Sequence, residues 1–198
     1  MSRLRAVRVA RAPLTRRSFL KFALAGFLPS AAYAHAPLGL VGPQQPAPAL
    51  PLTLHDGTAS DLPRLLQGHW TALQLMFTTC SATCPIQGAV FASLQSKLAG
   101  TLPHGQLLSV SIDPLNDTSA ALAAWRKRFG AQPFWLAAAP PVQHANVLLD
   151  FLNSRASSSD RHTAHVLLFD DQARFAYRCA EFANASDIAR LMLQMARR

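Results

Sequence analysis

Residues 71–85 read Thr71-Ala72-Leu73-Gln74-Leu75-Met76-Phe77-Thr78-Thr79-Cys80-Ser81-Ala82-Thr83-Cys84-Pro85, and they predict a strand that passes directly into a helix. The apolar run 71–77 is typical of a buried strand. Pro85 suits the first turn of a helix, where its missing N–H costs nothing. The four-residue spacing of the next apolar side chains predicts a helix to about residue 98 with one buried face, formed by Ile86, Val90, Leu94 and Leu98. Cys80 and Cys84 therefore lie at a strand-to-helix junction.

Apolar runs and helical patterns alternate through the rest of the chain. Strands are expected at 50–54, 107–112, 134–136, 164–169 and 175–179, and helices at 119–129, 142–152 and 186–195. Strands separated by helices imply parallel β-α-β units, and the final strand–turn–strand–helix adds an antiparallel edge. The expected fold class is α/β, thioredoxin-like, with a central mixed sheet flanked by helices. The two cysteines would lie at the C-terminal end of the central strand, where open α/β sheets place their sites.

The N-terminal residues 1–34 predict an export signal. They hold seven basic residues and no acidic one, and the segment Thr15-Arg16-Arg17-Ser18-Phe19-Leu20-Lys21 resembles a twin-arginine signal. The uncharged run that follows is shorter than the roughly 20 residues of a membrane-spanning helix. We expect cleavage after Ala34 and a periplasmic protein. Retention as a weak anchor, giving loose association with the inner membrane, is the alternative.

The charge and composition of the remaining chain limit its function and organisation. The net charge of +9 falls to about +2 once the signal is removed, and no basic stripe remains that would bind nucleic acid. Residues 35–49 are rich in proline and are expected to form an extended, poorly packed lead-in, a tether outside the fold. Residues 50–198 have a suitable length for one domain, which we expect to be the thioredoxin-like one.

The cysteine pattern leaves two kinds of chemistry open. A helix start favours thiolate over thiol, and a thiolate is both a nucleophile and a soft-metal ligand. A structural disulfide is a third reading, but a Cys80–Cys84 bridge would close too short a loop to stabilise the fold much. The pair is thus expected to be a redox dithiol/disulfide or a metal clamp. Cys179, on a late strand, is expected to be a small buried hydrophobe rather than a resolving thiol.

A metal held by two sulfurs needs a further ligand, and the chain has seven histidines. Four of them are expected to be solvated surface groups, namely His55, His69, His104 and His144. His162 and His165 flank the entry to the strand 164–169, and their spacing of three prevents both from facing the same side of an extended strand. His35 would become the first residue after cleavage and is a minor candidate for a second copper site.

Three motifs in order resemble those of the SCO/SenC group of copper-handling proteins, over roughly residues 50–195. The first is Cys80-Ser81-Ala82-Thr83-Cys84-Pro85 after a strand that ends in aromatic and threonine residues. The second is Ser111-Ile112-Asp113-Pro114-Leu115-Asn116-Asp117-Thr118. The third is His162-Thr163-Ala164-His165-Val166-Leu167-Leu168-Phe169-Asp170.

The resemblance implies copper, as Cu(I) or Cu(II), bound by Cys80, Cys84 and His162. It implies a metallochaperone for the binuclear copper centre of cytochrome c oxidase, with a copper-receiving oxidase subunit as partner and thiol reductants or other copper chaperones as further partners. Asp113 and Asp117 are expected to cap the next helix or brace the loop. The alternatives are a thiol:disulfide oxidoreductase acting on a copper-receiving partner, and a redox or copper sensor.

Overall fold

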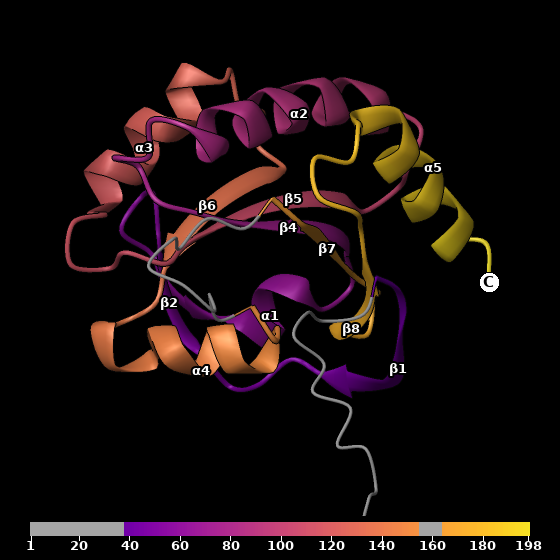
Figure 1. Cartoon of the computed structure of the whole chain (residues 1–198), viewed down its shortest axis with the longest axis horizontal. Coiled ribbons are helices and arrows are strands. Elements are labelled where there is room, and N and C mark those ends of the chain that lie inside the picture. The colour runs from indigo at the N-terminus through magenta and orange to yellow at the C-terminus, as the bar shows by residue number, and fades with distance from the viewer. Residues whose placement is uncertain (1–37, 155–163) are drawn as a thin grey trace, which may run out of the picture. The chain divides into compact units, whose positions relative to one another are not determined.

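The computed structural model describes residues 38–154 and 164–198, so the predicted export signal and His162 lie outside the described residues. One eight-stranded mixed sheet organises the fold, in the order β1-β8-β7-β4-β5-β6-β2-β3 (Figure 1). The strands are β1 (Gly39–Pro46), β2 (Pro51–Leu54), β3 (Ala59–Asp61), β4 (Trp70–Met76), β5 (Gly105–Ser111), β6 (Trp135–Ala139), β7 (Val166–Phe169) and β8 (Arg174–Arg178).

The centre of the sheet combines parallel and antiparallel pairs, as predicted. β5 pairs in parallel with both β4 and β6, whereas β7 pairs with β4 and β8 in the antiparallel sense. Six consecutive residues of β4 are buried, and so are six of β5. Strands covered on both faces are rich in apolar residues without strict alternation, which is why this part of the sheet could be recognised from sequence.

Helices cover both faces of the sheet (Figure 1). One layer contains α2 (Thr83–Leu98), α3 (Ser119–Arg128) and α5 (Ala185–Met195). The other contains α1 (Leu62–Leu66) and α4 (Ala145–Phe151), the latter preceded by the short 3-10 turn η1 (Val142–His144). Their buried side chains form separate apolar clusters on the two sides of the sheet. Within the described ranges, no helix is long and apolar enough to cross a membrane.

The lead-in differs from its prediction, because Gly39–Pro46 forms β1 along the edge of the sheet. It pairs antiparallel with β8, so the expectation of an unpaired tether was wrong for these residues. Proline is tolerated on an edge strand, where only one side of the backbone has a pairing partner. The short elements β3 and α1 were also not predicted.

The buried face of α2 was predicted only in part. Ile86 is 54% exposed and Val90 is half-buried, whereas Leu94 and Leu98 are buried as expected. At about 100° per residue, a strict four-residue spacing drifts around the helix by roughly 40° at each step. The observed buried face instead mixes steps of three and four, through Cys84, Gln87, Gly88, Phe91, Leu94, Gln95 and Leu98.

Candidate metal and thiol site

Cys80 and Cys84 meet at the start of α2. Cys80 ends a turn in which its N–H donates to the carbonyl of Phe77 (3.2 Å). The N–H of Cys84, in the first turn of α2, donates to Sγ of Cys80 (3.2 Å). The helix N-cap, Ala82, provides no side-chain acceptor. The sulfur of Cys80 therefore satisfies one of the N–H groups that a helix start leaves unpaired.

Both sulfurs lie in an apolar environment. Cys80 is 5% exposed and Cys84 is 4% exposed, and neither forms a disulfide. They belong to a buried cluster with side chains of β4, α3 and β6, namely Met76, Leu122, Trp125, Ala137 and Ala139. The two thiols are thus reduced, adjacent and largely shielded from water.

Burial controls the protonation of this pair. The pKa of the Cys84 thiol is raised to about 12. Desolvation is the largest cause, and a side-chain hydrogen bond with Cys80 acts in the same direction. A hydrogen bond with the backbone of Phe77 lowers the pKa in part. The expectation that the helix start would favour thiolate was therefore wrong for Cys84, because desolvation outweighs the helix dipole. A bound metal would have to displace the proton of Cys84.

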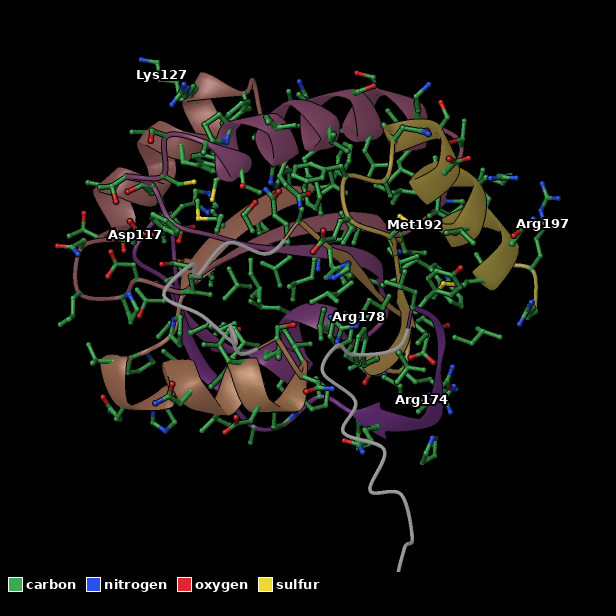
Figure 2. The ribbon with its side chains drawn as sticks, viewed as in Figure 1. Asp117, Lys127, Arg174, Arg178, Met192 and Arg197 are labelled. Atoms are coloured by element: carbon green, nitrogen blue, oxygen red, sulfur yellow. The ribbon has the colours of Figure 1, made fainter. Side chains whose placement is uncertain are left out.

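Asp117 holds the loop between β4 and the cysteines (Figure 2). Its carboxylate is 3% exposed and accepts three kinds of hydrogen bond. The backbone N–H of Thr78 donates to both oxygens (3.1 Å each), and the Thr78 hydroxyl donates to Oδ1 (2.5 Å). The Ser111 hydroxyl donates to Oδ2 (2.6 Å). The expectation that Asp117 braces the loop is confirmed, although its specific link to Thr78 was not predicted.

Asp113 has a more local role in the turn after β5. Its N–H donates to the Ser111 hydroxyl (2.9 Å), and its carboxylate accepts from the Asn116 side chain (2.8 Å). The cap of α3 is Thr118, whose hydroxyl accepts from Ala121 N (3.2 Å). Neither aspartate caps that helix, so the capping alternative was wrong for both.

His162 lies outside the described residues, but contacts on both sides of its segment are visible. Before it, the Arg178 guanidinium donates to the carbonyl of Leu152 and to the Ser154 hydroxyl (3.3 Å). After it, Nδ1 of His165 donates to the carbonyl of Cys179 (2.9 Å). Arg178, the last residue of β8, and Cys179, which follows it, therefore hold the chain on the two sides of residues 155–163.

His165 is engaged with its own neighbours. Besides the Nδ1 contact with Cys179, its Nε2 lies 3.6 Å from a carboxylate oxygen of Glu181. The histidines predicted to be solvated differ among themselves. His55 is half-buried with Nδ1 3.3 Å from the carbonyl of Ala137, and desolvation lowers its pKa. His69 and His104 lie against each other, with their ring centroids 6.3 Å apart.

Cys179 is 2% exposed and packs in the core beneath α5, with Ile188 and Met192 in the same cluster. Desolvation raises the pKa of its thiol to about 12. Its predicted role as a small buried hydrophobe is confirmed.

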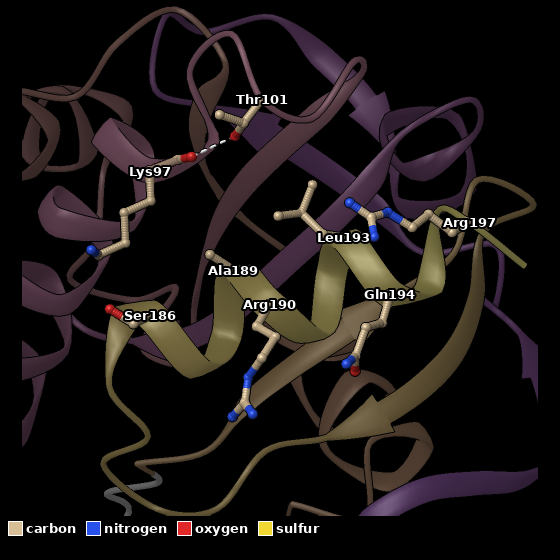
Figure 3. Close-up of a pocket in the computed structure, with 8 residues that line it drawn as sticks. All are labelled: Lys97, Thr101, Ser186, Ala189, Arg190, Leu193, Gln194 and Arg197. Atoms are coloured by element: carbon tan, nitrogen blue, oxygen red, sulfur yellow. Dashed lines mark hydrogen bonds between the residues drawn. The ribbon is translucent and has the colours of Figure 1, made fainter.

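A hollow between α2 and α5 has a different chemistry (Figure 3). Its volume is about 410 Å³, and its charged lining consists of Lys97, Arg190 and Arg197. Arg190 is already paired with Asp187 (2.5 Å). The lining holds no sulfur, imidazole or carboxylate, so it does not compete with the cysteines as a metal site.

The donor set at the cysteines fits copper. Two adjacent sulfurs in an apolar pocket suit a soft ion such as Cu(I), and an imidazole would also support Cu(II). The described part of the chain contains no group of three or more His, Cys, Asp or Glu side chains able to hold a metal. Among the described residues, no His, Cys, Asp or Glu side chain joins Cys80 and Cys84 as a third candidate ligand.

Comparison with solved structures places the fold. Arabidopsis thaliana ScoI, described with copper bound, has a TM-score of 0.66 at 18% identity, over 75% of this chain and 96% of that one. A SCO1/SenC family lipoprotein from Bacillus anthracis has a TM-score of 0.65 at 21% identity, over 79% of this chain and 99% of that one. BsSco has a TM-score of 0.63 at 20% identity, over 75% of this chain and 92% of that one. It is described as having a disulfide switch and as a member of the Sco family of cytochrome c oxidase assembly proteins.

These likenesses establish the Sco type of thioredoxin-like fold that was predicted. Comparison with curated protein sequences gives no match. The SCO1/SenC family model matches residues 48–197, which is most of the chain. With that match, and with the cysteine pair at the β4–α2 junction, the chain belongs to the SCO1/SenC family.

Proposed function

We propose that this protein is a periplasmic copper chaperone that binds copper through Cys80, Cys84 and His162. The observation that carries the proposal is the pair of buried cysteines, in contact at the start of α2 and not joined by a disulfide. The description of a structural neighbour with copper bound supports copper as the cargo. Binding of Cu(I) would replace the thiol protons by two sulfur–copper bonds and release those protons to solvent.

The choice of His162 rests on the direction of the chain before β7 and on the engagement of His165. Val166, the first residue of β7, pairs with Gln74 of β4. His162 is four positions before Val166 in the sequence. Because β7 runs antiparallel to β4, the chain before Val166 leads toward the C-terminal end of β4, which is the end that the cysteines follow. His165 already contacts the Cys179 carbonyl and Glu181, so it is the weaker candidate.

The proposed acceptor is the copper-receiving subunit of a respiratory oxidase. Its support is the family and the description of BsSco as belonging to a group of cytochrome c oxidase assembly proteins. The twin-arginine-like segment supports export to the periplasm, close to such a membrane-bound partner. Thiol reductants of that compartment would keep the pair reduced before copper enters.

The test is copper loading under anaerobic conditions, with copper and protein measured after gel filtration. One Cu(I) per chain is expected. Cys80→Ser and Cys84→Ser should lose Cu(I), and His162→Ala should lose most of the Cu(II) that gives thiolate-to-copper absorption. Cys179→Ser and His165→Ala are the matched controls and should retain both. Loading well below one copper per chain in the reduced protein, or full Cu(I) loading of the Cys84→Ser variant, would refute the proposal.

A thiol:disulfide oxidoreductase is the second candidate, favoured by the contact between the two thiols. In that reaction Cys80 and Cys84 would give two electrons and two protons to a disulfide of the partner, forming a Cys80–Cys84 disulfide and two partner thiols. Incubation of the reduced protein with a peptide disulfide from a copper-receiving protein, without copper, tests it. Failure to reduce that peptide at a periplasmic redox poise would eliminate this candidate.

A further inference from the structure

Two histidines face each other at the end of the sheet opposite the cysteines. His69 directly precedes β4, and His104 directly precedes β5. β4 and β5 are parallel neighbours, with Trp70 paired to Gly105. The same pairing extends one step further, because the N–H of Trp70 donates to the carbonyl of His104 (3.1 Å). The central register of the fold therefore fixes the two histidine backbones side by side.

The two imidazoles are close enough to share one ion. Their ring centroids are 6.3 Å apart, with an interplanar angle of 63°. With metal–nitrogen bonds of about 2.0 Å, two imidazoles on one ion have centroids roughly 5 Å apart at a tetrahedral angle and roughly 6.4 Å apart when trans. The observed separation is within this range at its upper end. His104 is exposed and His69 half-buried, so small side-chain rotations can reach either arrangement.

The surroundings leave room for an ion and its remaining water ligands. Both rings line a pocket of about 490 Å³ whose lining includes no lysine, arginine, aspartate or glutamate. His104 also has a left-handed backbone, with φ of 58°. A non-glycine residue in that region costs about 1 kcal/mol, and such strain is concentrated at functional sites. Glycine would adopt this turn at lower cost, but it would offer no ligand.

We infer that His69 and His104 form a second metal site, which binds a divalent first-row ion, Cu(II) most tightly. Imidazole suits these ions, and Cu(II) binds nitrogen sites more strongly than Ni(II) or Zn(II). The site differs from the cysteine pair in position and in ligand type. The seven residues of β4 separate the two, a distance of about 20 Å. An ion bound here would not contact the thiols.

The test uses the whole chain carrying Cys80→Ser and Cys84→Ser, because the cysteine pair would itself bind or reduce part of the added Cu(II). Its result is therefore independent of the proposed chaperone function. Cu(II) affinity would be measured at about pH 7.5, where imidazole is mostly neutral, by competition with glycine and by nitrogen hyperfine coupling in electron paramagnetic resonance. His69→Ala and His104→Ala should each weaken the site about a hundredfold, since the second imidazole binds as an intramolecular ligand. His144→Ala, on η1, is the matched control and should change nothing.

A second measurement needs no histidine variant. Diethyl pyrocarbonate modification, mapped by mass spectrometry, should show that one equivalent of Cu(II) protects His69 and His104 together. Joint protection and loss of affinity in both variants support the site. Protection of only one histidine, or unchanged affinity in either variant, would overturn the inference.

Discussion

Removing the carboxylate of Asp117 should loosen the loop that carries Cys80. The carboxylate is buried and accepts hydrogen bonds from Thr78 and Ser111 at 2.5–3.1 Å. In Asp117→Ala the Ser111 hydroxyl, which is fully buried, loses its acceptor, and so does the half-buried Thr78 N–H. An unsatisfied buried donor costs about 1–3 kcal/mol, and water can reach Thr78 in part. We expect the free energy of unfolding to fall by about 3 kcal/mol.

The assay is urea unfolding followed by far-UV circular dichroism. With an m-value of about 2 kcal/mol per molar, the midpoint should fall by roughly 1.5 M. Asp117→Asn keeps one acceptor oxygen and should lose about half as much. Asp113→Asn is the control, because Asp113 accepts only from the exposed Asn116 side chain, and it should change stability by less than about 0.5 kcal/mol.

The same variants report on the thiols. Release of Thr78 should let the Cys80 turn open, so Asp117→Ala should react with N-ethylmaleimide faster than the wild type under native conditions. Asp113→Asn should react at the wild-type rate. A stability change below about 0.5 kcal/mol in Asp117→Ala, together with an unchanged alkylation rate, would show that the hydrogen bonds do not hold the loop.

Three further predictions concern packing and protonation. Gly88→Ala places a Cβ 2.5 Å from the Phe129 ring, so overpacking should cost about 1–3 kcal/mol in thermal unfolding, whereas Ala89→Ser on the exposed side of α2 should cost under about 1 kcal/mol. Because Cys84 keeps its proton to a pKa of about 12, Cu(I) affinity measured against a chromophoric chelator should rise about tenfold per pH unit for each proton released; an affinity independent of pH from 6 to 8 would contradict this. Burial raises the pKa of Cys179 above its unfolded value, so the free energy of unfolding should fall as the pH rises from 9 toward 12. Between pH 8 and 10 the free energy of unfolding of the wild type should fall by about 1 kcal/mol more than that of Cys179→Ala. An equal fall in both proteins would argue against this cause.

The sequence predicted the parts of the fold whose signal is local. The runs that became β4 and β5 are mostly apolar because both faces of these strands are covered, and Pro85 marks the start of α2. β1 was missed because its residues are mostly exposed and its stability comes from pairing with β8, more than 120 residues later. The residue pattern within 39–46 therefore gives no indication that this segment pairs with β8.

The site was predictable where chemistry and position coincide in one motif. Cys80 and Cys84 are four residues apart, so their contact follows from the helix start itself. The contact of Asp117 with Thr78 joins residues 39 positions apart and depends on the order of β4 and β5. A signal for the histidine pair did exist, since His69 and His104 each precede a strand of a predicted parallel pair. The pair becomes visible only when the two strands are aligned in parallel, which places residues 69 and 104 side by side.

Burial of the sulfurs has a consequence for copper transfer. In the proposed function, a partner ligand would have to reach the metal before the thiolates release it, yet the thiols are about 5% exposed beside Trp125 and Leu122. The side of the pair that can open is the Cys80 turn, because Cys84 is held within α2. That turn is attached to the sheet through Thr78 and the Asp117 carboxylate. Charge-assisted hydrogen bonds are about twice as strong as neutral ones, so this attachment sets much of the free energy that opening requires. A docking partner that offers its own donor to Asp117, or its own acceptor to Thr78, would lower that free energy and so determine when the ion can leave.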